Sequence, residues 1–326
     1  MNPIENVVAD MPDIANETQV EVAGKLDWVG MNEIEMPVRI EDDAGGLIQS
    51  SALVTAYVNL TDPDVRGIHM SRLYLHLDQG FGERPLNPCT LRQLLRSFLD
   101  SHEGLSDRAL IRVDFDYVTR RPALASDNEG WRRYPVSMIG ILEGNEFSLE
   151  MGLEILYSST CPCSAALARQ LVQEQFTKDF AGQQLDFDAV RDWLGSEEGV
   201  MATPHAQRSA AEIRVRLTPT FEMFPIVELI DEIESALKTP VQATVKREDE
   251  KAFAELNGSN LMFCEDAGRR VQTALNSDER ILDFWARCTH FESLHPHNAV
   301  AVVTKGVESG YVAGAGAPVR LELSRT

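Results

Sequence analysis

The chain has 326 residues, of which 44% are hydrophobic, and its formal net charge is −21 at pH 7. This length and apolar content predict one large or two ordinary globular domains with a real core, and the strong negative charge argues against nucleic acid as a partner. An anionic substrate needs a local basic patch to bind against this average field.

The termini and the cysteines indicate a compartment. No apolar run approaches the roughly 20 residues that a membrane span needs, so no membrane association is expected. Residues 1–6 lack the basic and apolar regions of a signal peptide. The five cysteines are odd in number and too few for a disulfide framework, so we expect reduced thiols and a cytoplasmic location.

Residues 1–46 are acidic and rich in turn formers, and we interpret them as a flexible N-terminal arm. A first module is expected at residues 47–145, from apolar alternation and helical spacing. Its elements are strands at 49–60, 109–118 and 134–142, a turn entering a further strand at 67–74, a helix at 90–99 and a loop around 125–130. This order predicts an antiparallel sheet covered on one face by helix.

A second module, expected at residues 146–305, repeats that order, so the fold class is α+β. Its elements are strands at 146–158, 211–217, 281–291 and 298–303, and helices at 164–180, 226–238 and 260–275. Residues near 171–200 are interpreted as an inserted helical element on the surface. Residues 306–326 contain several glycines and are interpreted as a flexible C-terminal tail.

The most reactive stretch is the corner between the strand at 146–158 and the helix after it, where Cys161 and Cys163 flank Pro162. The partial positive charge of a helix N-terminus favours thiolate, which is both a nucleophile and a metal ligand. Pro162 fixes its own φ and disfavours helix at Cys161, so one sulfur can hold a metal while the other faces a substrate. The alternative is a pair of buried structural cysteines.

Further candidate ligands follow in the second module. They are His205, Glu250, Glu265, Glu292, His295 and His297. One thiolate, one imidazole and one carboxylate suit Zn²⁺ or a similar divalent ion and leave a position for water. The spacing is not that of a compact zinc motif, so it leaves open which of these residues meet.

Other polar residues have plainer structural interpretations. Cys264, Cys288 and the apolar stripe at 230–237 are expected in the core, and His76 and His102 on the surface. Glu248 and Asp249 are interpreted as a solvated charge run, and Arg269 with Arg270 as a complement to neighbouring acids.

Six short motifs occur in the order of a known family, from about residue 60 to residue 303. They are Gly67-Ile68-His69-Met70-Ser71-Arg72, Cys161-Pro162-Cys163-Ser164, His205-Ala206-Gln207-Arg208-Ser209, Lys246-Arg247-Glu248-Asp249-Glu250-Lys251, Phe263-Cys264-Glu265-Asp266 with Arg269, and Glu292-Ser293-Leu294-His295-Pro296-His297. Through them the chain resembles the prokaryotic GTP cyclohydrolases of type IB. The resemblance implies two tandem tunnelling-fold modules, antiparallel sheets with helices on one face, and homotetramers with active sites at subunit interfaces.

The resemblance also implies metal-dependent conversion of GTP and water to 7,8-dihydroneopterin triphosphate and formate, which opens tetrahydrofolate synthesis and feeds 7-deazaguanosine tRNA modification. It implies a Zn²⁺ or Mn²⁺ ion on Cys161, His205 and Glu250. Cys163 matches a second thiol that contacts substrate, and Glu265 matches the carboxylate that binds the guanine edge. The remaining polar wall, a candidate for proton transfer, consists of Glu292, His295 and His297.

A triphosphate needs cationic partners. We expect them to be Arg72, Arg208, Lys246 and Arg247. Three features depart from the family pattern: a long gap between Cys163 and His205, Glu248 in place of a frequent proline, and Pro296 in place of a frequent asparagine. Two rival functions are another tunnelling-fold enzyme acting on a pterin or deazapurine, and a non-catalytic metal-binding protein; formate release from GTP separates them.

Overall fold

The computed structural model describes residues 20–42 and 45–314. Within these ranges eight strands form one antiparallel sheet in simple chain order. The strands are β1 (Leu26–Glu41), β2 (Leu47–Leu60), β3 (Arg108–Pro122), β4 (Glu129–Glu143), β5 (Glu146–Thr160), β6 (Ala206–Leu217), β7 (Ile281–His290) and β8 (Ala299–Thr304). No helix in the described part of the chain is long and apolar enough to cross a membrane.

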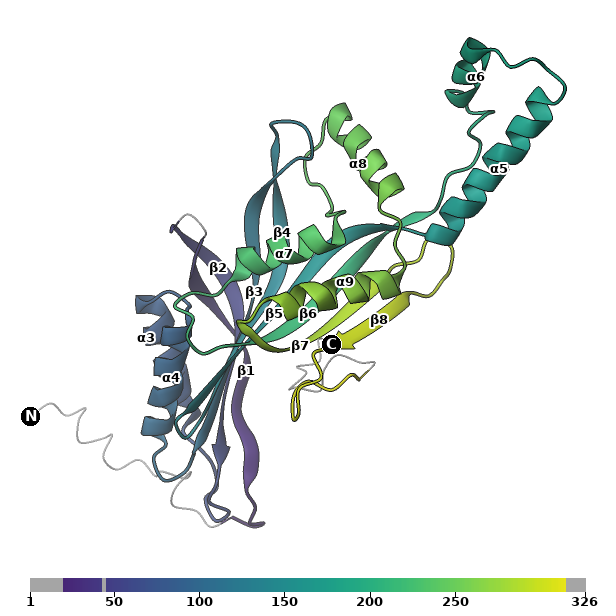
Figure 1. Cartoon of the computed structure of the whole chain (residues 1–326). Helices are drawn as coiled ribbons and strands as arrows, with labels where there is room; N and C mark the ends of the chain where they lie inside the picture. The colour runs from purple at the N-terminus through teal and green to yellow at the C-terminus, as the bar shows by residue number, and fades with distance from the viewer. Residues whose placement is uncertain (1–19, 43–44, 315–326) are drawn as a thin grey trace, which may run out of the picture.

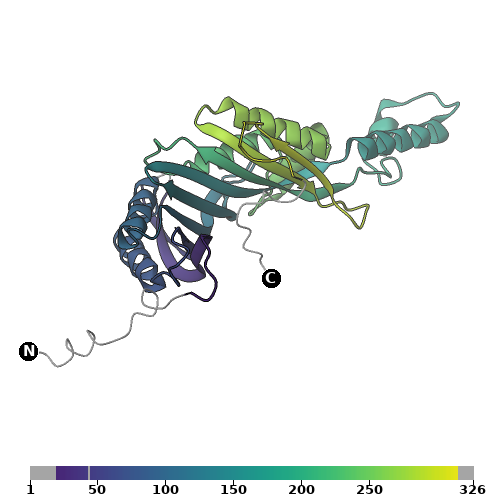
Figure 2. The same cartoon turned by 90° about the horizontal axis from the view of Figure 1, so that it is seen from below.

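The helices lie on one side of the curved sheet, apart from a pair that projects away from it (Figures 1 and 2). They are α3 (Met70–Glu83), α4 (Pro88–Ser101), α5 (Pro162–Phe180), α6 (Phe187–Leu194), α7 (Ile226–Leu237), α8 (Arg247–Ser259) and α9 (Cys264–Ser277). The first module consists of two strands, two helices and two strands. The second also has four strands, with α5 and α6 between its first two strands and three helices, α7 to α9, before its last two. The structure confirms the α+β class and the tandem pair of modules.

The two modules share one continuous sheet because β4 and β5 form a tight hairpin. Their register runs from Val136 opposite Leu153 to Glu143 opposite Glu146. Gly144 occupies the turn with φ +57°, a conformation that costs glycine little. The sequence suggested a sheet for each module, and this short turn leaves no room to separate them.

The core lies between the sheet and the helices. Helix α4 buries Leu91, Leu95 and Phe98, which recur at helical spacing on one face. Its N-terminus is set by Asn87, whose side chain accepts from the backbone N–H of Thr90 at 2.8 Å. In the second module α7 buries its 230–237 stripe and α9 packs on β7 and β8.

Four expectations differ from the structure. Residues 26–41, expected in a flexible arm, form the edge strand β1, so the first module begins before residue 47; residues 1–19 lie outside the described part. The expected strand at 67–74 contains the start of helix α3. Glu248 and Asp249, expected as a solvated charge run, lie in the first turn of helix α8, where Asp249 is buried. His102 is 1% exposed, not a surface residue.

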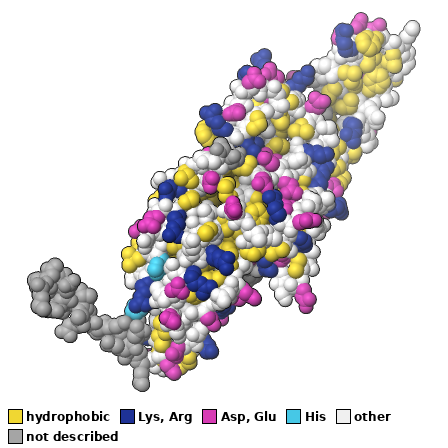
Figure 3. All heavy atoms as spheres, turned by 60° about the vertical axis from the view of Figure 1, so that its left-hand side comes forward, with side chains coloured by type: hydrophobic (Ala, Val, Ile, Leu, Met, Phe, Trp, Pro, Cys, Tyr) yellow, Lys and Arg dark blue, Asp and Glu magenta, His cyan; other side chains and the backbone are white. Residues whose placement is uncertain are grey.

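The projection consists of α5 and α6 and grows from the end of β5 (Figure 1). Three aromatic rings join the two helices: Phe176, Phe180 and Trp193. Only Ala165 and Ala168 of α5 are buried, and Phe187 is 80% exposed. Apolar side chains are also visible at the far end of the projection (Figure 3). The insertion expected near 171–200 is therefore helical and lies outside the main body; the C-terminal tail expected at 306–326 is described only to residue 314.

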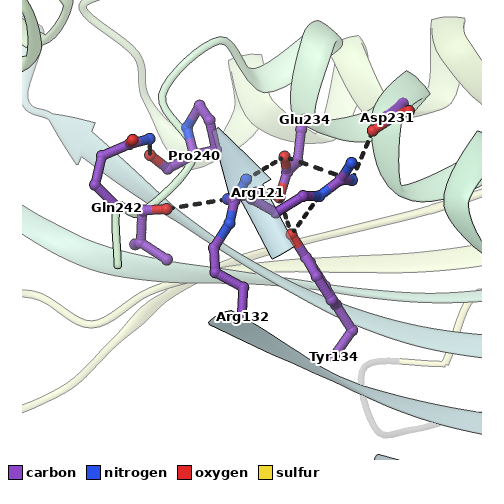
Figure 4. A network of polar contacts seen from close by, with 8 residues as sticks. Arg121, Arg132, Tyr134, Asp231, Glu234, Pro240 and Gln242 are labelled. Carbon is purple, nitrogen blue, oxygen red and sulfur yellow. Dashed lines mark hydrogen bonds and ion pairs between the residues drawn. The ribbon is translucent and has the colours of Figure 1, made fainter. Parts of the chain in front are cut away.

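A charged network fastens the first module to the second (Figure 4). Arg132 on β4 donates to both carboxylate oxygens of Glu234 on α7, at 2.9 and 3.2 Å. Tyr134 donates to the same carboxylate at 2.8 Å, and Arg121 donates to Tyr134 at 3.2 Å. Arg121 also pairs with the exposed Asp231 at 2.6 Å. Burial and the charge of Glu234 raise the pKa of Tyr134 to about 12, so the phenol stays a donor.

The Glu234→Gln substitution is expected to lower the free energy of unfolding by roughly 3 kcal/mol, because it leaves the largely buried guanidinium of Arg132 without its counter-charge. Urea titration of the full chain measures this. The matched control is Asp231→Asn, whose side chain is 59% exposed, and it should cost no more than about 1 kcal/mol. Equal losses in the two variants would contradict the assignment of the network to Glu234.

Candidate active site

The sequence motifs of the second module meet at one end of the sheet. Thr160, the last residue of β5, pairs with Ala206, the first of β6. The backbone N–H of Cys161 donates to the carbonyl of His205 at 3.2 Å, and the N–H of His205 donates to Ser164 Oγ at 3.1 Å. The long gap between these motifs is therefore the segment that forms α5 and α6, and its two ends lie side by side at Cys161 and His205.

The thiol corner begins helix α5. Cys161 is the N-cap residue with extended backbone, Pro162 is the first helical residue, and Cys163 lies in the first turn. Cys161 is half-buried and Cys163 is exposed, so the two thiols do differ in access to solvent. A pair of buried structural cysteines, the alternative interpretation, does not fit this exposure.

Helix α9 begins beside the same strand end. Leu261 forms a parallel bridge with Thr160, and the N–H of Met262 donates to the carbonyl of Thr160 at 3.1 Å. Glu265 follows in the first turn of α9 and is exposed. Its own backbone N–H and the thiol of Cys264 hold the pKa of the Glu265 carboxyl below its usual value. An ionised carboxylate only accepts hydrogen bonds, which suits the N–H groups of a guanine edge.

The end of β7 completes this region. His290 pairs with Ser209, and the N–H of Phe291 donates to the carbonyl of Arg208 at 3.2 Å. The loop that follows carries the proton-transfer candidates, with Glu292 half-buried and His295 and His297 exposed. The two imidazole rings stack at 4.9 Å between centroids. Arg208 is exposed at the start of β6 and belongs to the same end of the sheet.

Helix α8 places Glu250 differently. Its first turn is held against the turn between β3 and β4, because the buried carboxylate of Asp249 accepts from the backbone N–H groups of Ala125 and Ser126, each at 2.8 Å. These hydrogen bonds hold the pKa of Asp249 far below its usual value. The other end of α8 contacts β5, where Asn257 accepts from Ser158 Oγ at 2.7 Å.

Glu250 is thus about 10 Å along the helix from the residue that touches β5. Among the described residues no group of three or more His, Cys, Asp and Glu side chains lies ready to hold a metal ion. The structure of a single chain therefore brings Cys161 and His205 together but does not add Glu250 to them. Lys246 and Arg247 lie with Glu250 at the start of α8, and Arg72 lies on α3, where it donates to the carbonyl of Ser101 at 2.6 Å.

Sequence reasoning missed a set of buried polar residues beneath this site. Tyr157, Ser159, Ser209 and His290 are all buried, as is Gln207. The signal was present in the alternation of β6, since residues 205, 207 and 209 must share one face of a strand. A polar side chain on a buried face requires a partner, and that pattern passed unnoticed because 211–217 carried the clear apolar alternation.

Comparison with known proteins agrees with this arrangement. A family model described as "Type I GTP cyclohydrolase folE2" matches residues 11–301. The chain belongs to this family. "GTP cyclohydrolase FolE2" of Hydrogenovibrio crunogenus is 52% identical over 301 residues, covering 92% of this chain and 96% of the relative. "GTP cyclohydrolase FolE2" of Pseudoalteromonas translucida is 49% identical over 301 residues, with 92% and 99% covered.

Among solved structures, the uricase of Arthrobacter globiformis is similar, with a TM-score of 0.48 and 12% sequence identity over 89% of this chain and 97% of the uricase. Membership of the FolE2 family confirms the resemblance that the six motifs carried. Each of these relatives covers 92% of this chain, and the range matched by the family model includes the residues at the end of the sheet where the motifs meet.

Proposed function

We propose that this FolE2 family member is a metal-dependent GTP cyclohydrolase that converts GTP and water into 7,8-dihydroneopterin triphosphate and formate, the first step of tetrahydrofolate synthesis. One observation carries the proposal. A thiol corner, an imidazole and an ionised carboxylate, which are far apart in the sequence, converge on one end of the sheet through Cys161, His205 and Glu265.

The donor types fit a divalent metal ion. Cys161 and His205 are neighbours across two strand ends. Thiolate and imidazole ligands suit Zn²⁺, and a mixed set of this kind is not strongly selective, so it also accepts Mn²⁺. A bound metal would lower the pKa of a water ligand and so supply hydroxide as a nucleophile near neutral pH. The proposed third ligand, Glu250, requires a movement of α8 or a contribution from a neighbouring copy. A homotetramer with interfacial sites, which we also propose, offers the second route.

The chain's own groups then have separate tasks. Glu265 accepts from the guanine edge and orients the purine, while Cys163 faces the substrate from the first turn of α5. His295 and His297 are exposed to the same region and exchange protons near neutral pH as the ring opens and formate leaves. Arg208 is the best placed cation for the triphosphate; Arg72, Lys246 and Arg247 require a neighbouring copy or a rearrangement to reach it. All five cysteines are free, which supports a reducing compartment such as the cytoplasm.

Incubation of the metal-loaded protein with GTP is expected to yield formate and, after oxidation, fluorescent neopterin. Removal of the metal with a chelator should lower the rate at least about 100-fold, because a metal contributes several kcal/mol to stabilising developing charge, and Zn²⁺ or Mn²⁺ should restore it. Full activity in exhaustively demetallated protein would refute metal dependence. A protein that binds metal and GTP but releases no formate would refute the cyclohydrolase itself.

A further inference from the structure

Beneath the site a series of polar groups, buried from Gln207 onward, crosses three strands. His205 Nδ1 lies 2.9 Å from Gln207 Oε1, and Gln207 Nε2 donates to Ser159 Oγ at 2.8 Å. Ser159 Oγ lies 2.8 Å from Ser209 Oγ, and Ser209 acts on the phenol of Tyr157 by lowering its pKa against the larger effect of burial. Tyr157 Oη lies 3.1 Å from Nε2 of the last member, His290.

We infer that this series of hydrogen-bonded groups fixes the proton positions on His205 and His290, and that Gln207 and Tyr157 are positioning residues for the proposed reaction. The inference rests on the proposed function, because it assigns the chain a role at that site. None of these positioning residues is required to touch GTP.

The direction of each hydrogen bond follows from the chemistry of the amide. Gln207 turns its oxygen to His205 and its nitrogen to Ser159, and an amide oxygen only accepts. Nδ1 of His205 must therefore carry the proton. Nε2 is then left with its lone pair, which is the form that binds a divalent cation. The opposite amide orientation would place the proton on Nε2 and block that role.

The remaining protons follow in sequence. Ser159 receives a hydrogen bond from Gln207, and we assign the proton between the two serines to Ser159, whose hydroxyl then donates to Ser209. We assign Tyr157 as the donor to Nε2 of His290, because burial keeps the phenol protonated, and this leaves the proton of that ring on Nδ1. All the dipoles point the same way along the chain, an arrangement in which each bond strengthens the next.

Both ends of the Tyr157–His290 pair stay neutral. Burial lowers the pKa of His290 to about 4, and burial raises the pKa of Tyr157 far above its usual value. The negative charge of Glu265 acts on the His290 ring and opposes this lowering. The chain therefore runs from a candidate metal ligand to a neutral ring that feels the charge of the guanine-binding carboxylate.

Because these polar groups are buried, each of them needs a hydrogen-bond partner within the protein. Tyr157, Ser159 and Ser209 have no exposed surface, and an unsatisfied polar group there is costly. A core that needed only packing would place apolar residues at these positions. In metal sites, polar residues that hydrogen bond a metal-binding imidazole orient its ring. Loss of such a residue typically weakens metal affinity about 10–100-fold.

Two substitutions at Gln207 separate positioning from packing. In Gln207→Glu a carboxylate still accepts from His205 Nδ1 but cannot donate to Ser159; in Gln207→Leu both bonds are lost. Zn²⁺ affinity, measured by competition with a chromophoric chelator in the full chain without GTP, should stay within about 3-fold of wild type in the first variant and fall about 10–100-fold in the second. Equal losses would overturn the inference, because packing alone predicts no difference between the variants.

The tautomers themselves are read by long-range ¹H–¹⁵N spectra of histidine-labelled protein without metal. The wild type should show Nδ1–H on both His205 and His290, assigned through His205→Gln and His290→Gln. The Tyr157→Phe variant should change the His290 pattern alone. An Nε2–H form of His205 in the wild type overturns the inference even if the Gln207 variants fail to fold. These measurements need no turnover, so a protein that fails to convert GTP would refute the proposed function and leave this test standing.

Discussion

Replacement of Cys161 by alanine is expected to remove the metal and the activity together, whereas replacement of Cys163 should remove activity and leave the metal. Cys161 is the N-cap of α5, and its backbone is hydrogen bonded to that of His205, so its thiol belongs to the strand ends. Cys163 lies beyond Pro162 in the first turn and is exposed, which fits the proposed contact of its thiol with substrate.

The expected sizes differ for the two variants. Loss of a residue that merely orients a ligand costs about 10–100-fold in metal affinity, so loss of the Cys161 thiolate should cost more than about 100-fold. Cys163→Ala should keep metal affinity within a few-fold of wild type. Its rate should fall by about 10²–10⁴-fold, the range for a positioned group that acts on substrate in the transition state.

Metal analysis of the purified variants and formate release together measure both effects. A further readout is mild alkylation of the wild type, which should modify Cys163 before Cys161 because Cys163 is exposed and Cys161 is half-buried, and which GTP should slow at Cys163 but not at the exposed Cys89. Equal metal loss in the two variants would show that both thiols bind the ion. Full metal retention in both would move the metal away from this corner.

The Glu265→Gln variant is expected to bind GTP at least about 100-fold more weakly while its metal affinity stays unchanged. In the proposed role the carboxylate accepts from two N–H groups of a guanine edge, whereas the amide of glutamine places its own N–H group opposite one of those donors. A site built around such hydrogen bonds discriminates strongly against a mismatched partner, because polar groups are left unpaired. Calorimetric titration with GTP at low temperature measures the affinity directly.

The neighbouring acid supplies a matched control. Asp266 lies in the same first turn, accepts from the N–H of Phe263 at 3.1 Å and pairs with Arg269 at 2.9 Å. Both of these contacts lie within the first turns of α9, so Asp266→Asn should lower thermal stability slightly and leave GTP affinity unchanged. Normal GTP binding with loss of metal in Glu265→Gln would assign that carboxylate to the ion instead.

Much of the fold was readable because local patterns report burial. The helical spacing of Leu91, Leu94, Leu95 and Phe98 predicted α4, since those side chains pack on the sheet. Edge strand β1 gave no such signal. One of its sides faces solvent and most of its residues are partly exposed, so its sequence resembles a polar arm. The start of α3 was mistaken for a strand because apolar Ile68 and Met70 alternate with polar residues, and this stretch is too short to distinguish the strand period from the helix period.

The sequence by itself determined the family, through six ordered motifs, and the reactive residue types, because thiols, imidazoles and carboxylates are recognisable without coordinates. Only the tertiary structure decided which of them meet. The pairing of β5 with β6 places His205 beside Cys161 across a long insertion, while the hydrogen bonds of Asp249 draw Glu250 toward another turn. Such distances depend on strand register and helix placement, which are set by contacts between residues remote in the chain. For the same reason, the buried path from His205 to His290 appears only when three strands lie side by side.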